Sequence, residues 1–157
     1  MNEKKANIIP KVLLFLIDIS ILILGAALIA LPFVFRMLPV NILSIHFFGD
    51  SYQSSLVFFM VCTLLFLGII NETRKVLKTM VRKDPICELN IKYFKRIAYL
   101  SYVFAAVFIF KTIVDFSMPT PLMSLTFLFL GIFTHVLSYI FYKANNSKVS
   151  EGNDIKT

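Results

Sequence analysis

Asn71 to Ile97, with the sequence NETRKVLKTMVRKDPICELNIKYFKRI, is a basic segment that lies between two apolar halves of the chain. It holds half of the 16 Lys and Arg residues, namely Arg74, Lys75, Lys78, Arg82, Lys83, Lys92, Lys95 and Arg96. Lys and Arg beside membrane spans are retained on the cytoplasmic side. We therefore expect residues 72–97 to form a cytoplasmic loop that fixes the topology of the whole chain.

The basic segment also carries local helix signals. Its first cations, from Arg74 to Arg82, recur at intervals that suit a helix leaving the membrane, and Asp84-Pro85 breaks that helix. A second helix is expected to begin near Glu88 to Asn90 and to carry Lys92, Lys95 and Arg96 back to the membrane.

The composition places the chain in a membrane. Of its 157 residues 58% are apolar and the mean hydropathy is +0.80, whereas soluble domains have an apolar share of about 45–50%. A net charge of +7 could indicate nucleic acid binding, but the basic residues flank apolar segments, so we expect no direct contact with nucleic acid. The sequence predicts one all-α integral membrane domain over residues 1–157.

Four apolar segments are long enough to cross a bilayer, which takes about 20 helical residues. They are residues 12–35, 54–71, 98–116 and 121–142. The first is 24 residues long, longer than the core of about 7–15 residues found in a signal peptide, so we interpret it as a retained helix that Pro32 kinks or ends. The polar tail, residues 143–157, is expected to be mobile.

Two features give the orientation. Residues 1–11, 72–97 and 143–157 carry 14 of the 16 Lys and Arg residues, which leaves only Arg36 and Lys111 for the outer side. Four tyrosines would lie at the inner interface, where amphipathic rings settle: Tyr99, Tyr102, Tyr139 and Tyr142. We predict four transmembrane helices arranged as two antiparallel hairpins, with both termini in the cytoplasm.

Asp18 and His135 are ionisable residues inside the predicted spans. An ionisable group there costs roughly 2.5–3.5 kcal/mol on insertion scales and usually needs a partner or water. Each lies seven residues from the inner end of its helix, a depth of roughly 10 Å, so the two are predicted to pair. The pair could be a proton or ion site, a polar clasp between the first and last helices, or an Asp18 that reaches interfacial water.

Three further features have structural explanations. Lys111 and Asp115 are four residues apart and close enough to pair, and a lysine that reaches the outer interface explains them. His46 is interpreted as an interface residue of the outer loop. Ala26 and Ala30 have the spacing that lets helices approach closely, either inside the monomer or between copies, so a homo-oligomer stays open.

The sequence gives no sign of an enzyme, a cofactor or a metal site. It contains neither of the short motifs H-E-x-x-H and G-x-S-x-G, nor a glycine loop for phosphates. Cys62 and Cys87 have no second Cys or His at ligand spacing, and we expect no disulfide between them.

The layout of the central segment and tail resembles a known family. The similarity rests on Leu77-Lys78, Asp84-Pro85, Asn90, Lys95-Arg96-Ile97 and the tail from Glu151 to Ile155. In these features the chain resembles small bacterial four-span membrane proteins of the domain of unknown function 2975 family. The resemblance implies four helices in a bacterial plasma membrane and members that often occur beside small helix-turn-helix regulators. It implies no catalytic residues.

These observations predict a non-enzymatic multi-pass membrane protein of unknown role. It would act as a tether or regulator that engages a cytoplasmic regulatory protein through the basic segment. The alternative is a small transporter or ion-coupled subunit that uses Asp18 and His135. A third interpretation is that the basic segment serves only topology and the binding of anionic lipid head groups at the inner face.

Overall fold

The computed structural model of the protein describes residues 8–37, 52–81, 87–114 and 119–154. These residues form four helices: α2 (Ile8–Met37), α4 (Tyr52–Val81), α5 (Glu88–Val114) and α6 (Pro119–Asp154). Each contains a segment of 25 to 29 residues that is long and apolar enough to cross a membrane, with mean hydropathies from 2.8 in α2 to 1.8 in α6. The described part of the chain is therefore all-helical, with four candidate membrane spans, as the sequence predicts.

The ends of two helices follow from local chemistry. Pro119 is the first residue of α6, a position that suits proline because its missing N–H would have no partner there. Glu88 lies in the first turn of α5, where a negative charge is favourable, and the N–H of Asn90 donates to the carbonyl oxygen of Cys87 over 3.1 Å. The predicted start of a helix near Glu88 is confirmed.

The helix expected to leave the membrane within residues 72–97 is also confirmed, since α4 continues to Val81 before α5 begins at Glu88. Two other helix boundaries differ from the sequence predictions. Pro32 does not end α2, which continues to Met37. The tail expected to be mobile from residue 143 is helical as far as Asp154. Hydropathy marks where a helix leaves the bilayer, and polar residues can continue the same helix into water.

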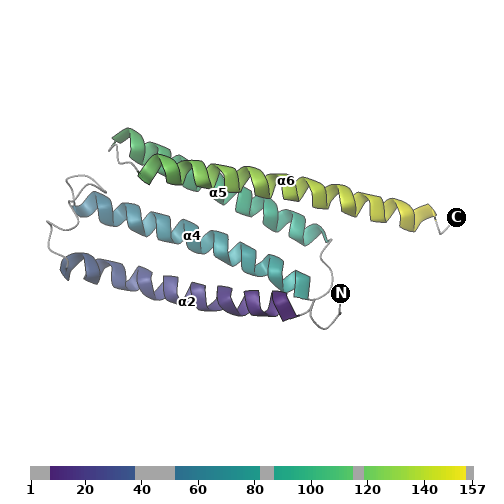
Figure 1. Cartoon of the computed structure of the whole chain (residues 1–157), viewed down its shortest axis with the longest axis horizontal. Coiled ribbons are helices and arrows are strands. Elements are labelled where there is room, and N and C mark those ends of the chain that lie inside the picture. The colour runs from purple at the N-terminus through teal and green to yellow at the C-terminus, as the bar shows by residue number, and fades with distance from the viewer. Residues whose placement is uncertain (1–7, 38–51, 82–86, 115–118, 155–157) are drawn as a thin grey trace.

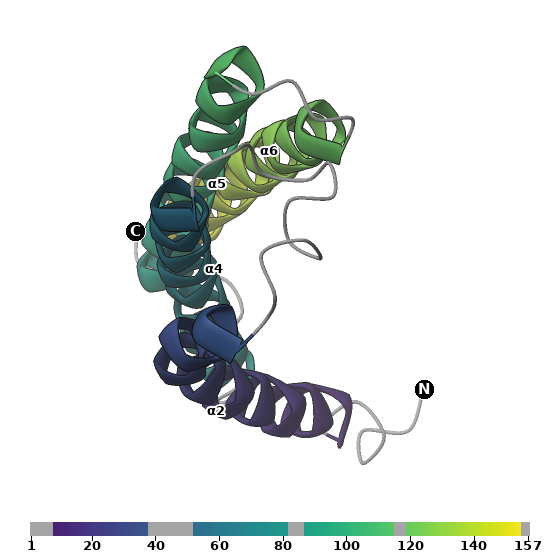
Figure 2. The ribbon, with the colours of Figure 1, turned by 90° about the vertical axis from the view of Figure 1, so that its left-hand side faces the viewer.

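The helices form a curved row in the order α2, α4, α5, α6. Within the described residues, extensive packing joins only consecutive helices. Figure 2 shows the row nearly end-on, with α2 at one end and α6 at the other. In Figure 1 the colours show that consecutive helices run in opposite directions, so α2 and α5 begin, and α4 and α6 end, at the same end of the molecule. We call this the basic end.

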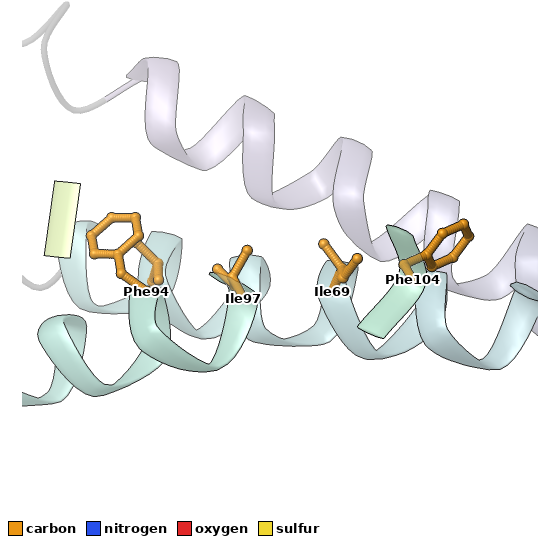
Figure 3. Packing of buried hydrophobic residues seen from close by; sticks show 5 residues of the cluster. Ile69, Phe94, Ile97 and Phe104 are labelled. Atoms are coloured by element: carbon orange, nitrogen blue, oxygen red, sulfur yellow. The ribbon is translucent and has the colours of Figure 1, made fainter. Parts of the chain in front are cut away.

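The best-buried apolar side chains lie where α4 and α5 meet. Ile69, Val76, Phe94, Ile97 and Phe104 form a buried cluster, against which residues of α6 also pack. Figure 3 shows four of these side chains following one another along the two helices. Near the middle of α5, the ring centroid of Phe104 lies 3.9 Å from that of Phe127 on α6. The core thus joins α4, α5 and α6, whereas none of the span in α2 is buried.

Candidate functional site at the basic end

Most charged side chains of the described residues gather at the basic end, on the last turns of α4 and the first turns of α5. These turns lie outside residues 54–71 and 98–116, the apolar segments predicted from the sequence to cross the membrane, but they belong to the same helices. Helical periodicity places residues three or four apart on one face, so the charges there are divided between inward and outward faces. The inward charges hold the helices to each other.

An ion pair joins α2 to α4. The Oδ1 atom of Asp18 lies 2.5 Å from the Nε atom of Arg74, and each side chain is about one-third exposed, at 37% and 35%. The Nε–H does not point at the carboxylate oxygen, so the contact is ionic by distance and is not a well-aligned hydrogen bond. A carboxylate inside the first span therefore has a cationic neighbour, which lowers the cost of placing it there.

The structure does not bring Asp18 and His135 together. His135 is exposed on α6, and α6 lies at the opposite end of the row from α2. Their equal depths along two helices suggested the pair, but depth does not determine which helices are neighbours. The prediction took Arg74 for a loop residue outside the second span, and so missed it as the partner of Asp18.

A second ionic cluster links α4 to α5 and centres on Glu72. This residue is only 8% exposed. Its Oε1 atom accepts a hydrogen bond from Lys75 over 2.5 Å and lies 3.9 Å from the Nη1 atom of Arg96 on α5. The Lys75 ammonium also lies over the ring of Tyr93, 5.8 Å from its centroid. No role was predicted for Glu72 from the sequence, although its position directly after the apolar segment 54–71 was an available signal.

Buried hydrogen bonds continue these links towards α6. Asn90 on α5 is fully buried, and its Oδ1 atom accepts a hydrogen bond from the Thr79 hydroxyl on α4. The buried Ser138 hydroxyl on α6 donates to the carbonyl oxygen of Ile91 over 3.3 Å. Buried polar groups that are satisfied in this way favour one packing of the helices over alternatives. At the basic end, polar contacts thus join each pair of neighbouring helices in the row.

Cations on the outward faces remain exposed. Of the eight in the central segment, Arg74 and Lys75 serve the internal contacts above, and Arg82 and Lys83 lie outside the described residues. The remaining four are exposed, and we call them the basic surface: Lys78, Lys92, Lys95 and Arg96. The three on α5 share one helix face with the exposed ring of Tyr99.

The opposite end of the molecule carries little charge. Lys111 of α5 is only 7% exposed, and its ammonium lies 5.9 Å from the centroid of the Phe58 ring on α4. The expected lysine at the outer interface therefore lies inward against α4, while its predicted partner Asp115 lies outside the described residues, as does His46. The Thr112 hydroxyl donates to that of Thr120 over 2.9 Å and links α5 to α6 there.

Two other sets of candidate residues form no site in the described part of the chain. Ala26 and Ala30 are exposed, so the small-residue spacing is not used for packing inside the monomer. Cys62 and Cys87 are free thiols. No group of three or more His, Cys, Asp or Glu side chains within the described ranges could hold a metal ion.

The arrangement at the basic end can bind an anionic group. Asp18 and Glu72 lie against cations, while the exposed charged groups of α4 and α5 at this end, within the described residues, are Glu88 at the start of α5 and the Lys and Arg side chains of the basic surface. Comparisons of the chain with protein-family models, with curated proteins and with solved structures found no match.

Proposed function

We propose that the chain is a non-enzymatic multi-pass protein of a bacterial plasma membrane that binds an acidic cytoplasmic protein through the basic surface. The observation that carries this proposal is the division of the central cations. Arg74 and Lys75 are held by Asp18 and Glu72, whereas the four cations of the basic surface stay exposed, and among these four only Arg96 has an ionic contact within the described residues, at 3.9 Å from Glu72. Exposed positive charge speeds the encounter with a negatively charged partner and disfavours the binding of positively charged proteins.

The proposed topology has two antiparallel hairpins with both termini in the cytoplasm. It is supported by the distribution of Lys and Arg, of which 14 lie in the three predicted inner segments and two on the outer side. The alternating helix directions agree, because they bring the described parts of all three inner segments to the basic end. In this topology the basic surface faces the cytoplasm.

The resemblance to the domain of unknown function 2975 family suggests which partner to test first. Members of that family often occur beside small helix-turn-helix regulators, so a regulator with an acidic surface is the first candidate. A membrane tether of this type would act by holding the regulator at the bilayer.

The transporter alternative receives less support. An ion-coupled site needs a titratable group that exchanges its partner along a polar path. Asp18 lies against Arg74, and His135 is exposed on a helix that is not packed against α2. The polar residues that the alternative would use are therefore separated.

The test is a cross-linked pull-down from native membranes with two charge-matched variants. One carries Lys78→Gln and Lys92→Gln on the basic surface. The other carries Lys11→Gln and Lys143→Gln, two exposed cations at the same end of α2 and α6. We expect an acidic cytoplasmic protein to be recovered with the wild type and the control but to be lost with the first variant. Recovery that is equal in all three samples, or recovery of no protein in any, would refute the proposal.

A further inference from the structure

A surface groove lies between α4 and α5 at the basic end. It has a volume of about 330 Å³, within the range of roughly 300–1,000 Å³ that ligand sites occupy. The groove is lined by Glu72, Lys95, Arg96, Tyr99 and Leu100. It brings together two cations, one carboxylate and an apolar wall.

The lining residues change character along α5. Lys95 and Arg96 are exposed and precede residues 98–116, the apolar segment that the sequence predicts to cross the membrane, whereas Tyr99 and Leu100 on the next helical turn lie within that segment. A ligand in the groove would therefore meet cations first and apolar side chains deeper in the bilayer. That order fits an amphiphile with a negatively charged head and an acyl chain, and tyrosine rings favour the interfacial depth at which the head would lie.

The charges around the groove favour an anion. Lys75, Lys95 and Arg96 contribute three positive charges, and Glu72 contributes one negative charge. The net formal charge is then +2. An anionic phosphodiester would complement this charge, whereas a zwitterionic head would leave it uncompensated.

Glu72 adds a requirement of its own. Its Oε1 atom is engaged by Lys75, but its Oε2 atom is shielded from solvent and has no hydrogen-bond partner within the described residues. A buried acceptor that stays unsatisfied is costly, and a charged one is more so. A hydrogen-bond donor on the ligand would relieve this cost.

We infer that the groove binds an anionic phospholipid whose head group carries hydroxyl donors, such as a phosphatidylglycerol. Lys95 and Arg96 hold the phosphodiester, a head-group hydroxyl donates to the Glu72 carboxylate, and Tyr99 and Leu100 contact the upper acyl chain. The groove shares Lys95 and Arg96 with the basic surface, but lipid binding lies within one copy of the chain and needs no second protein, so it can be tested on the purified chain alone.

The test is a titration of the purified protein, in a neutral detergent, with two short-chain lipids of equal charge. Phosphatidylglycerol offers hydroxyl donors, and phosphatidylmethanol has the same phosphodiester without them. Native mass spectrometry would count the bound lipid. We expect phosphatidylglycerol to bind the wild type about tenfold more tightly, the effect of one hydrogen bond to a charged group.

Three variants test which residues cause the preference for phosphatidylglycerol. Glu72→Met, similar in length but without an acceptor, should bind the two lipids equally. Lys95→Gln, which removes an exposed cation and should leave the fold intact, is expected to weaken both lipids about fivefold. Lys143→Gln, which removes an exposed cation outside the groove lining, should change neither affinity. Equal affinity of the two lipids for the wild type, or an effect of Lys143→Gln as large as that of Lys95→Gln, would overturn the inference.

Discussion

The ion pair between Asp18 and Arg74 decides between two arrangements of the helices, and a double-mutant cycle can measure it. The variants are Asp18→Asn, Arg74→Gln and their combination. The observable is the free energy of unfolding of the detergent-solubilised protein, from SDS titration followed by circular dichroism. The structure predicts a coupling energy between these two positions and none between Asp18 and His135.

The magnitude follows from the burial of the pair. Fully exposed ion pairs are worth about 0.2–1 kcal/mol, and breaking a fully buried pair costs about 3–5 kcal/mol. Asp18 and Arg74 are about one-third exposed, so the discounted coupling should be about 1.5 kcal/mol.

The two single variants should differ. Arg74→Gln leaves a short carboxylate side chain unpaired inside a span and should lower the free energy of unfolding by about 2 kcal/mol. Asp18→Asn leaves the Arg74 guanidinium unpaired, but the long arginine side chain can reach the interface. This variant should therefore lower the free energy of unfolding by only about 1 kcal/mol. The double variant should then cost about 1.5 kcal/mol, less than the sum of the two single variants.

A second cycle, with Asp18→Asn and His135→Ala, is the matched control. These side chains lie on helices that are not neighbours, so their effects should add within about 0.3 kcal/mol. A coupling below about 0.3 kcal/mol for Asp18 with Arg74, together with one above about 1 kcal/mol for Asp18 with His135, would refute the arrangement of the row.

Two further predictions concern the packing of α5 against α6 and use the same unfolding assay. Gly131→Ala should lower the free energy of unfolding by about 1–2 kcal/mol, because a Cβ atom there would lie 2.6 Å from the Tyr102 ring. Gly25→Ala should be neutral or slightly stabilising, because a Cβ atom at that position meets nothing within 4 Å. Equal effects of the two substitutions would contradict the close approach of the helices. Phe104→Ala should cost about 3 kcal/mol because the side chain is 4% exposed and stacks on a ring of α6, while Phe129→Ala, at 60% exposure, should cost little. A larger loss for Phe129→Ala would place the core elsewhere.

Hydropathy was sufficient to predict the spans but not the ends of the helices. The four apolar segments are easily recognised, and each is expected to be one long helix because a helix satisfies the backbone inside a bilayer with its own hydrogen bonds. From Asn71 to Val81 and from Lys143 to Asp154 the sequence turns polar, yet the helices continue. A change from lipid to water alters which side chains are favoured without removing the backbone hydrogen bonds of a helix.

The contacts at the basic end were harder to predict. A sequence gives the depth of Asp18 and His135 but not the lateral order of helices, so it could not show that α4 lies between α2 and the rest of the row. The basic segment was found from its charge alone. Its division into inward Arg74 and Lys75 and outward Lys92 and Lys95 depends on which helix face meets a neighbour, and that becomes known only with the packing.

The orientation of the basic end in the membrane underlies both the protein partner and the lipid groove, and Cys87 provides a natural probe of it. In a Cys62→Ser background, Cys87 is the remaining thiol and lies directly before α5. A Gly49→Cys variant without the native cysteines would serve as a control for the predicted outer side. We expect a membrane-impermeant thiol reagent to label Cys87 in inverted vesicles but not in intact cells, and to label the control cysteine in intact cells but not in inverted vesicles. Labelling of Cys87 from outside intact cells would contradict this orientation.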